Sequence, residues 1–356
     1  MTAIKELFGH NQQGDAVHRY VLKNKQGMEV AILDRGATIH SIRTQDKNGD
    51  MGEVTLGCDT VADYEHSNAY FGAIAGRYAN RICKGKLSIA GKELQLACNN
   101  GVNHLHGGVR GFDDRIWNAE FCSVEEQNTL VLRYFSQNGE EGYPGNLKVR
   151  IEYILNNQNE LLIDYQATTD QTTIVNLTNH AYFNLKGRGS CREHRIQINA
   201  KHYTPTDATS IPTGTVEPVT GTPMDFTEMK TIGQDIDAEF IQLKQALGGY
   251  DHNWVIRNNS ESPVAPVLIA RVEEDQSGRT MEVLTTQPGL QFYSGNFLEG
   301  EPARYGKVYQ KQEGFCLETQ HFPDSPNRPA FPSTELKPNE KYHHQTVFRF
   351  GLLCCA

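Results

Sequence analysis

The sequence predicts an all-β protein, built as a large antiparallel β-sandwich with few short helices. Apolar and polar residues alternate with a period of two over residues 128–136, 147–156 and 160–169, which is typical of strands that bury one face. The turn-forming stretches NGEEGYPGN and NNQNE separate these segments, as in an antiparallel meander. Helical spacing of apolar residues is rare, and the chain has 32 glycines and 14 prolines, which interrupt helices and favour turns.

The remaining elements follow from the same patterns. Residues 28–44 predict short strands around Gly36. Further strands are expected at 172–185, 265–274, 279–287 and 342–353. At 235–249, apolar residues at positions 236, 240, 243 and 247 precede a pair of glycines, which predicts one surface helix. The chain has neither a repeat of fixed period nor a Pro/Ser-rich linker, so we expect a single domain over residues 1–356.

The charge balance bears on the possible partners. The formal net charge is -9, with scattered lysines, whereas nucleic-acid binding and anionic membranes both require clustered Lys and Arg. We therefore expect neither partner. No stretch approaches the roughly 18 to 20 apolar residues of a membrane-spanning helix. A phosphate-loop motif, a GxGxxG motif after a strand and a GxSxG motif are also absent, which argues against nucleotide cofactors and serine esterase chemistry.

Cysteine usage and the N-terminus indicate the compartment. The eight cysteines, at 58, 83, 98, 122, 191, 316, 354 and 355, form no CxxC motif. The first residues, MTAIKELFGHNQQGDAVHRY, lack the basic start and apolar run of a secretory signal. We therefore expect reduced thiols in a cytoplasmic protein. The terminal pair Cys354–Cys355 and the pair His343–His344 suggest no role beyond structure.

Several local sequences are candidates for chemistry. In GFCLETQHFPDSPN, Glu318 closes a short apolar strand before a rigid polar loop, although a surface glutamate is the ordinary interpretation. In GRYANRICKG, Asn80 and Arg81 interrupt an apolar stretch, and Arg offers a planar fork of donors for oxygen-rich ligands. YDHNWVI adds Asp251, and TTQPGLQFYSGNFL adds Gln291. Each of these residues taken alone is also consistent with a structural role.

Two histidine motifs complete the set. In NHLHGG, His104 and His106 would share one face of an extended strand and could form half of a metal site. No Cys or carboxylate follows at ligand spacing, so a metal is disfavoured. In NLTNHAYFNL, an alternating strand would present Asn176, Thr178, His180, Tyr182 and Asn184 together. Such a polar and aromatic face is typical of a sugar-binding surface, and a solvated sheet face is the alternative.

Taken together, these motifs resemble those of the aldose 1-epimerases (galactose mutarotases). GRYANRI, NHLHGG, NLTNHAYFNL, YDHNW, QPGLQFYSGNFL and GFCLETQHFPDSPN occur in this order, over roughly residues 15–350, and EEGYPGNL also resembles a family loop. The resemblance implies a single galactose mutarotase-like supersandwich domain. It also implies interconversion of the α and β anomers of free hexoses such as galactose and glucose, without a metal or organic cofactor.

The resemblance further implies roles for seven residues. Glu318 corresponds to the family's general base and His180 to its general acid. Residues that hold the sugar hydroxyls or the ring oxygen correspond to Asn80, Arg81, His106, Asp251 and Gln291. The residue types suit the reaction, because a carboxylate can take the proton of the C1 hydroxyl while a histidine beside negative charge can hold a proton for the ring oxygen.

Three other functions remain as alternatives. A hexose-phosphate epimerase would require an added cluster of Arg or Lys near the motifs, which the sequence lacks. A non-catalytic sugar-binding sandwich would require neither an acid nor a base. A glycosidase could use Glu318 and Asp251 as its two carboxylates. The preferred aldose, and the choice between monomer and homodimer, stay open at the level of sequence.

Overall fold

The computed structural model describes residues 4–124, 127–257 and 263–353, and it confirms the all-β antiparallel fold. Cys354–Cys355 lies outside the described residues. The largest sheet has nine strands, in the spatial order β11 (Asn118–Val124), β12 (Gln127–Ser136), β13 (Leu147–Leu155), β14 (Glu160–Thr169), β28 (Tyr342–Leu352), β24 (Arg279–Thr285), β23 (Val267–Glu273), β18 (Arg195–Ile198) and β21 (Lys230–Thr231). The meander predicted over residues 128–169 is therefore present as β12, β13 and β14.

Two smaller sheets accompany it. The six-stranded sheet has the order β17 (Tyr182–Phe183), β26 (Phe315–Gln320), β25 (Gly289–Tyr293), β22 (Asp251–Val255), β19 (His202–Thr204) and β20 (Glu217–Pro218). The five-stranded sheet has the order β1 (Ile4–His10), β2 (Ala16–Lys23), β3 (Glu29–Leu33), β4 (Thr38–Gln45) and β5 (Met51–Glu53).

Short ladders and helices connect these sheets. The two-stranded ladders are β10 (His104–Leu105) with β7 (Arg81–Ile82), β15 (Thr173–Ile174) with β27 (Glu335–Leu336), β16 (Thr178–Asn179) with β6 (Ile74–Ala75), and β8 (Lys86–Ile89) with β9 (Lys92–Gln95). The α-helices of the described chain are α1 (Val61–His66) and α2 (Ile241–Gln245). Single 3-10 turns lie at Cys83–Gly85, Phe112–Asp114, Glu140–Gly142, Arg304–Gly306 and Ser325–Asn327.

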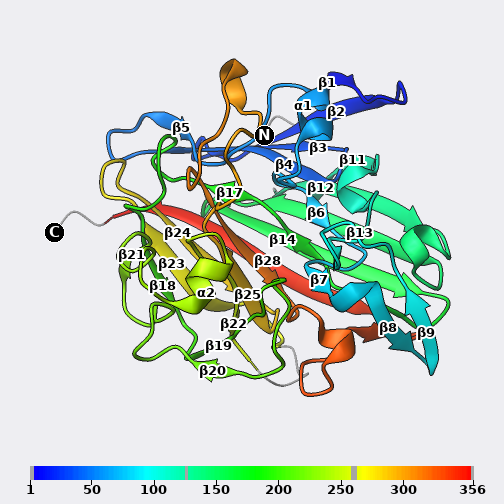
Figure 1. Cartoon of the computed structure of the whole chain (residues 1–356). Coiled ribbons are helices and arrows are strands. Elements are labelled where there is room, and N and C mark those ends of the chain that lie inside the picture. Colours follow the sequence, from blue (N-terminus) through cyan, green and yellow to red (C-terminus); the bar gives the residue numbers. More distant parts are fainter. Residues whose placement is uncertain (1–3, 125–126, 258–262, 354–356) are drawn as a thin grey trace.

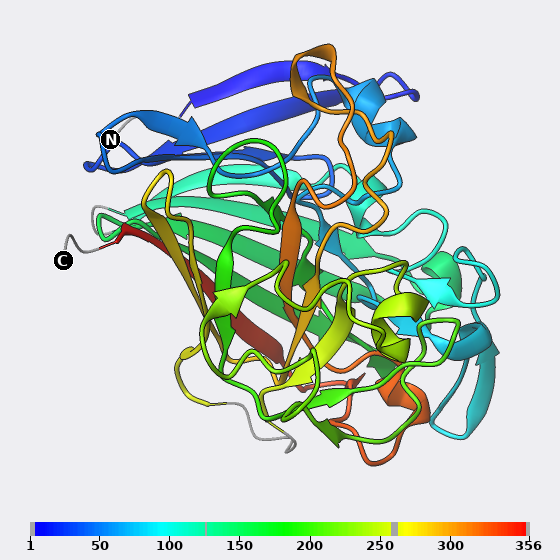
Figure 2. The ribbon, with the colours of Figure 1, turned by 60° about the vertical axis from the view of Figure 1, so that its left-hand side comes forward.

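The sheets are stacked in layers. The five-stranded sheet (blue) lies over β12–β14 (green), and the six-stranded sheet lies against β28 (red) and its neighbours (Figures 1 and 2). Tyr20 of β2 packs on Phe121 of β11 at 5.4 Å between ring centroids. Phe183 of β17 packs on Phe348 of β28 at 4.9 Å. One continuous apolar core therefore joins the large sheet to both smaller ones.

The predicted helix at 235–249 is largely wrong. Only Ile241–Gln245 is helical, and its N-terminus at Phe240 has no side-chain cap. The residues before it form turns, and Leu247, in a left-handed conformation, is exposed. The apolar spacing reflects burial of Ile236 from a turn and of Leu243 from the short helix α2, rather than one continuous helical face.

The predicted strand at 172–185 is also wrong as a single element. This segment forms three two-residue strands, β15, β16 and β17, which pair with β27, β6 and β26 respectively. Its side chains therefore do not alternate between two faces. Asn176 bonds the backbone of Ala79 and His321, and Asn184 bonds that of Gly189 and Glu313. The expected five-residue polar face is absent, since only His180 and Tyr182 of that set line the pocket described below.

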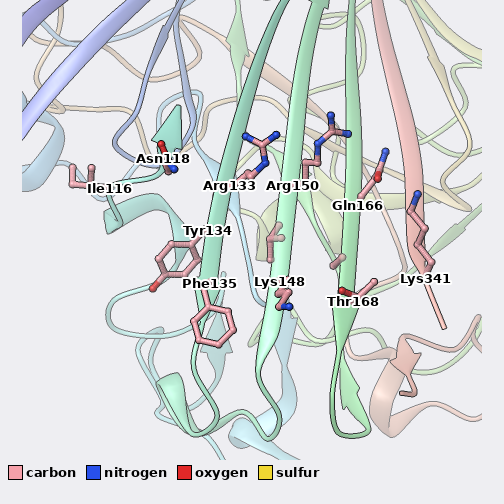
Figure 3. A pocket seen from close by; sticks show the side chains of 12 residues that line it. Ile116, Asn118, Arg133, Tyr134, Phe135, Lys148, Arg150, Gln166, Thr168 and Lys341 are labelled. Carbon is pink, nitrogen blue, oxygen red and sulfur yellow. The ribbon is translucent and has the colours of Figure 1, made fainter. Parts of the chain in front are cut away.

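Two hollows lie on opposite sides of this framework. One, of about 660 Å³, lies on the outward face of the nine-stranded sheet (Figure 3). The other, of about 230 Å³, lies over the six-stranded sheet, on the face turned away from the core. His343 and His344 of β28 line neither hollow. They bond to Asp164 of β14 and to Thr286, the residue after β24. No helix in the described ranges has the length and apolar character needed to cross a membrane.

Candidate active site

Strand alternation in the six-stranded sheet places three predicted residues on one face. Leu290 and Leu317 enter the core, so their neighbours Gln291 and Glu318 point the other way. Gln291 pairs directly with Glu318 across β25 and β26, and with Asn253 of β22. The alternation in β22 puts Asp251 on the same face as Asn253. Glu318 lies within its strand, which continues to Gln320 rather than ending at the carboxylate as the sequence suggested.

This face forms the floor of the 230 Å³ pocket. The lining residues are Asn68, Ala69, Tyr70, Asn80, Arg81, Asn100, Leu105, His106, His180, Tyr182, Asp251, Tyr293, Phe297, Glu301 and Glu318. Six of the seven sequence-predicted site residues are among them. The seventh, Gln291, is buried beneath the pocket and donates from Nε2 to Asp251 Oδ1 at 2.7 Å. Gln291 therefore fixes the position of the Asp251 carboxylate, which lines the pocket, and does not line the pocket itself.

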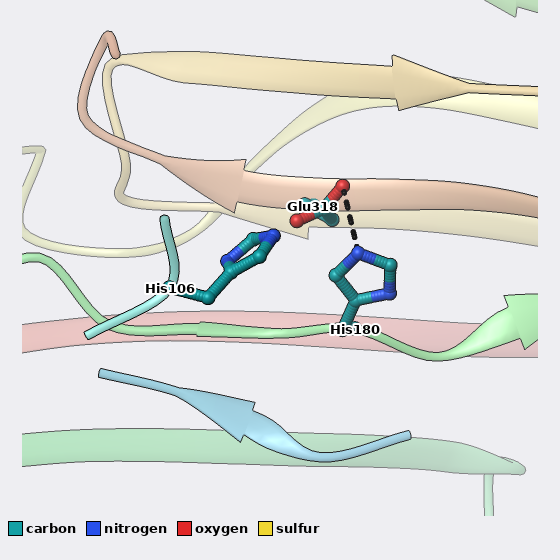
Figure 4. Close-up of side chains that lie close together, drawn as sticks. All are labelled: His106, His180 and Glu318. Atoms are coloured by element: carbon teal, nitrogen blue, oxygen red, sulfur yellow. Dashed lines mark ion pairs between the residues drawn. The ribbon is translucent and has the colours of Figure 1, made fainter. Parts of the chain in front are cut away.

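Glu318 and His180 face each other in this pocket. His180 Nε2 lies 3.7 Å from Glu318 Oε1, and both side chains are almost fully buried (Figure 4). The other ring nitrogen of His180, Nδ1, lies 3.6 Å from the thiol of Cys316. Cys316 and Glu318 are two residues apart on β26 and therefore share a face. Each ring nitrogen of His180 therefore faces one side chain of β26: Nε2 faces Glu318, and Nδ1 faces Cys316.

Burial shifts the proton affinities of this pair. It raises the pKa of the Glu318 carboxyl well above its ordinary value, and the nearby charge of Asp251 raises it further. Burial also lowers the pKa of His180 to about 4. The expectation that a neighbouring carboxylate keeps His180 protonated is therefore not met, because desolvation of the imidazolium outweighs the nearby negative charge of Asp251. Both groups are driven toward their neutral forms.

His106 is positioned as a hydrogen-bond donor. It adopts a left-handed conformation, with φ of 48°, so it does not share an extended face with His104 as predicted. The backbone N–H of Asn80 donates to His106 Nδ1 at 3.1 Å. Burial holds the pKa of His106 well below its ordinary value, so the ring is neutral and its hydrogen resides on Nε2. His104 is buried elsewhere, against Tyr143 and the carbonyl of Ala97.

Glycine 107 makes the turn after His106 possible. Its φ is +93°, and a Cβ atom there would lie 1.8 Å from the backbone oxygen of Gly76. No side chain is compatible with that approach. Gly107 of the NHLHGG motif therefore allows the backbone turn that directs His106 into the pocket. It is not required for contact with a ligand.

His106, His180 and Glu318 together have the donor set of a metal site. One potential ligand atom from each lies within 4.8 Å of the others. A histidine that binds a metal normally donates its second ring N–H to a neighbouring acceptor. His106 does the reverse, because its Nδ1 accepts from the backbone N–H of Asn80, which leaves Nε2 protonated. His106 is therefore better placed to donate a hydrogen bond to a ligand oxygen than to bind a metal ion.

Arg81 and Asp251 form the polar wall of the pocket. Arg81 Nη1 lies 3.7 Å from Asp251 Oδ2, and Arg81 Nε donates to Asn100 Oδ1 at 3.2 Å. Asn80 Oδ1 accepts from the backbone N–H of Arg81 at 2.8 Å. Asn80 has a φ of 65°, a left-handed conformation that Asn tolerates better than most residues. Asn80 thus fixes the backbone at Arg81, while Asn100 and Asp251 orient the guanidinium and leave its remaining donors for a ligand.

Sequence reasoning missed much of the pocket rim. Asn68, Tyr70, Asn100, Phe297 and Glu301 all line it, and all lie in loops or turns. The ring of Tyr70 lies 4.7 Å from that of His106. Glu301 Oε2 accepts from Ser67 Oγ at 2.6 Å and so joins two loops that are 234 residues apart. No local sequence signal marks these residues, except that Phe297 falls within the QPGLQFYSGNFL motif.

Comparison with known proteins gives a consistent result. The family model described as Aldose 1-epimerase matches residues 18–349. The chain is 43% identical to galactose mutarotase of Sus scrofa, over 99% of each chain. It is 38% identical to aldose 1-epimerase of Escherichia coli (strain K12), over 95% of this chain and 96% of that one.

Solved structures agree with these relatives. The galactose 1-epimerase of Lactobacillus acidophilus NCFM superimposes with a TM-score of 0.86 at 28% identity, over 99% of both chains. A GalM/aldose epimerase homologue from C. elegans superimposes with a TM-score of 0.84 at 30% identity, over 94% of this chain and 98% of that one. On the family match, the identities and the shared fold, this chain belongs to the aldose 1-epimerase family.

Proposed function

We propose that this protein interconverts the α and β anomers of free aldohexoses, with Glu318 as general base and His180 as general acid. The observation that carries the proposal is the buried Glu318–His180 pair, 3.7 Å apart, at the floor of a small polar pocket. The names of the relatives, galactose mutarotase and aldose 1-epimerase, support the same reaction. An aldohexose is the expected substrate, without a metal or organic cofactor.

The reaction requires one acid and one base. Ring opening removes the proton of the C1 hydroxyl and delivers a proton to the ring oxygen as the C1–O5 bond breaks. The aldehyde then rotates about C1–C2 and recloses from its other face with the two roles exchanged. A pair of side chains that shares one proton meets this requirement, because the protonated member can act as the acid while the other acts as the base. Burial favours that proton on Glu318 over His180, and its transfer to His180 would generate the carboxylate that acts on C1.

The other polar groups are proposed to hold the sugar. His106 Nε2–H and the free donors of Arg81 supply hydrogen bonds to sugar oxygens, while Asp251 accepts from a hydroxyl. Asn80 fixes the backbone at Arg81, Asn100 orients the guanidinium, and Gln291 orients Asp251. Tyr182, Tyr293 and Phe297 supply apolar surface against which the C–H face of a pyranose packs.

The electrostatics of the pocket argue against a phosphorylated substrate. Among its lining residues Arg81 is the sole Lys or Arg, whereas Asp251, Glu301 and Glu318 are carboxyl groups. A phosphate dianion would meet more like charge than opposite charge there. We therefore favour free sugars over hexose phosphates.

Polarimetry of freshly dissolved α-D-galactose and α-D-glucose tests the proposal. We expect the protein to accelerate the approach to the equilibrium rotation for at least one of the two sugars. Spontaneous rates for both, together with acceleration for hexose 6-phosphates, would favour the phosphate epimerase. Sugar binding without acceleration would favour a binding protein. Release of chromophore from an aryl glycoside would favour a glycosidase.

Cys316 provides a matched pair of variants. Since a hydrogen bond is typically worth about 1 kcal/mol, removal of the thiol that contacts His180 Nδ1 in Cys316→Ala should lower kcat by about fivefold. Cys316→Ser keeps a donor and acceptor at this position and should retain most of the activity. KM should change little in either variant. Equal kcat losses in both would mean that Cys316 contributes packing alone.

Chelation should have no effect on turnover. Because His106 Nε2 carries a hydrogen, the three-residue cluster does not offer a complete ligand set. We expect the same kcat before and after dialysis against EDTA, measured by polarimetry. A loss of activity that added Zn²⁺ or Mn²⁺ restores would contradict this assignment of the His106 tautomer.

A further inference from the structure

The hollow on the outward face of the nine-stranded sheet is a second polar site, separate from the sugar pocket. It has a volume of about 660 Å³ and shares no lining residue with that pocket (Figure 3). Its floor is formed by β12, β13 and β14, at the ends where these strands approach the 136–147 connection. Its lining includes four cations, Arg133, Lys148, Arg150 and Lys341, and no carboxylate. This contrasts with the net charge of -9 for the whole chain.

The strand register brings these cations together. Arg133 is directly opposite Arg150 across β12 and β13, and Lys148 is next to Arg150 on the same face of β13. Like charges directly opposite each other destabilise an antiparallel pair. The ion pairs of Arg133 with Glu120 and of Arg150 with Glu152 offset part of this repulsion, and a bound anion would relieve the rest.

The neighbouring carboxylates neutralise the group only partly. Arg133 contacts Glu120 at 3.1 Å, but the two side chains are 45% and 63% exposed, so the pair is weak. Arg150 contacts Glu152, which lies outside the hollow. Within the described ranges, Lys148 and Lys341 have no ion-pair or hydrogen-bond partner from a side chain. The hollow thus retains a net positive charge.

We propose that this hollow binds a small anionic ligand that carries two or more phosphate groups. Arg133 and Arg150 present planar forks that match phosphate oxygens, with Lys148 and Lys341 as further cations. The side-chain amide of Gln166, directly opposite Arg150 on β14, donates one N–H to Asp164 Oδ1 at 2.6 Å and has a second N–H for a ligand. Phe135, directly opposite Lys148 and 49% exposed, offers an apolar surface for an organic group attached to the phosphates. The volume lies within the range of roughly 300–1,000 Å³ that is usual for small-ligand sites.

Calorimetric titration with inorganic tripolyphosphate tests the proposal on the full chain. We expect wild type to bind, with an affinity that falls as ionic strength rises. The double variant Arg133→Ala/Arg150→Ala should bind about 100-fold more weakly, since each lost charge-assisted contact typically costs a factor of about ten or more. Mutarotation by this variant should equal that of wild type, which verifies the fold.

A matched variant controls for net charge. Arg195→Ala/Arg271→Ala removes two arginines from the same sheet, each also in an ion pair with Glu273. It should bind tripolyphosphate as wild type does. Equal weakening in both double variants would overturn the proposal, because binding would then follow overall charge. Absence of binding to wild type at low salt would overturn it as well.

Further binding experiments distinguish which kind of molecule carries the phosphate groups. If ADP binds more tightly than pyrophosphate, and Phe135→Ala removes the difference, the ligand is a nucleotide or a similar organic phosphate. Equal binding of ADP and pyrophosphate supports recognition of the phosphates alone. Co-sedimentation with vesicles that contain a polyphosphorylated inositol lipid, lost in Arg133→Ala/Arg150→Ala, would identify a lipid headgroup as the source.

Discussion

Replacement of Glu318 by glutamine is expected to lower kcat for mutarotation by about 10² to 10⁴-fold, the usual contribution of a positioned general base. The substitution preserves shape and removes only the ability to exchange a proton with the C1 hydroxyl. The measurement is polarimetry of α-D-galactose at several enzyme concentrations, with the spontaneous rate subtracted. Retention of wild-type kcat would contradict the assignment of Glu318 as the base.

The same substitution should leave the protein at least as stable. Glu318 Oε2 is buried without a hydrogen-bond partner, and burial raises the pKa of the carboxyl. An acid with a raised folded-state pKa costs stability above its unfolded-state pKa, because the unfolded chain releases the proton that the folded one retains. Glu318→Gln removes that cost at neutral pH. A rise or no change in the free energy of unfolding, together with the loss of kcat, would separate a catalytic role from a structural one.

Glu274→Gln is the matched control. Glu274 is also buried, but it accepts hydrogen bonds from the backbone N–H groups of Ser277 and Gln276, at 2.7 and 3.0 Å, outside the pocket. These bonds lower the pKa of its carboxyl despite burial. We expect the reverse outcome there: wild-type kcat, and a loss of stability of about 1–3 kcal/mol.

His180→Asn gives a second test of the pair. If Glu318 and His180 exchange one proton as a unit, removal of either should cost nearly as much as removal of both. The double variant Glu318→Gln/His180→Asn is therefore expected to match the slower single variant in kcat. Multiplicative losses would mean that the two side chains act independently.

The contrast between the floor and the rim of the pocket explains what the sequence could predict. Alternation within each strand is local, so the orientation of Glu318 away from Leu317 follows from the sequence. The adjacency of β22, β25 and β26 is not local. In the sequence, β23 and β24 of the nine-stranded sheet lie between β22 and β25, and residues 294–314 separate β25 from β26. Motif resemblance, and not periodicity, predicts that Glu318, Gln291 and Asp251 belong to one site.

The errors have a common physical origin. His106 and His180 lie in irregular segments whose backbone is fixed by long-range contacts, such as the bond from the backbone of Asn80 to His106. A period-two rule applied to such segments gives the wrong faces, as it did at 172–185. The helix predicted at 235–249 is wrong over most of its length because a turn buries Ile236 and the short helix α2 buries Leu243, at a spacing that resembles one longer helix. The prediction of a single domain over residues 1–356 stays a prediction.

A second large effect is expected on acidification. Burial is the leading cause of a lowered pKa at eight histidines: His40, His104, His106, His180, His194, His252, His321 and His344. Three of these rings accept a hydrogen bond from a backbone N–H. The donors are Asn80 to His106, Leu185 to His194 and Asp251 to His252. Protonation would remove each acceptor and place a charge in the interior, so the folded state resists it.

The sign and size follow from linkage. Below the ordinary pKa of 6.5 the unfolded chain binds protons that the folded chain refuses until its pKa of about 4, for example at His194 and His252. Stability is therefore lost as the pH falls from 6.5 toward 4. Each such histidine costs about 1.4 kcal/mol per pH unit, or about 2 kcal/mol at pH 5. Asp34, Asp113 and Glu318, whose pKa values burial raises, act in the opposite sense, but they are fewer.

Summed over several histidines, this loss is comparable to a typical stability of about 5–15 kcal/mol, so we expect cooperative unfolding near pH 5. Urea unfolding at pH 7, 6 and 5.5 gives the slope of the free energy of unfolding against pH.

His194→Gln keeps an acceptor for the Leu185 N–H and should reduce that slope by about 1.4 kcal/mol per pH unit below pH 6. His202→Gln, at an exposed histidine, should leave it unchanged. Equal slopes in wild type and His194→Gln would place the acid sensitivity in carboxylates instead. The buried histidines would then have to be protonated within the folded state, which the backbone donors to their rings oppose.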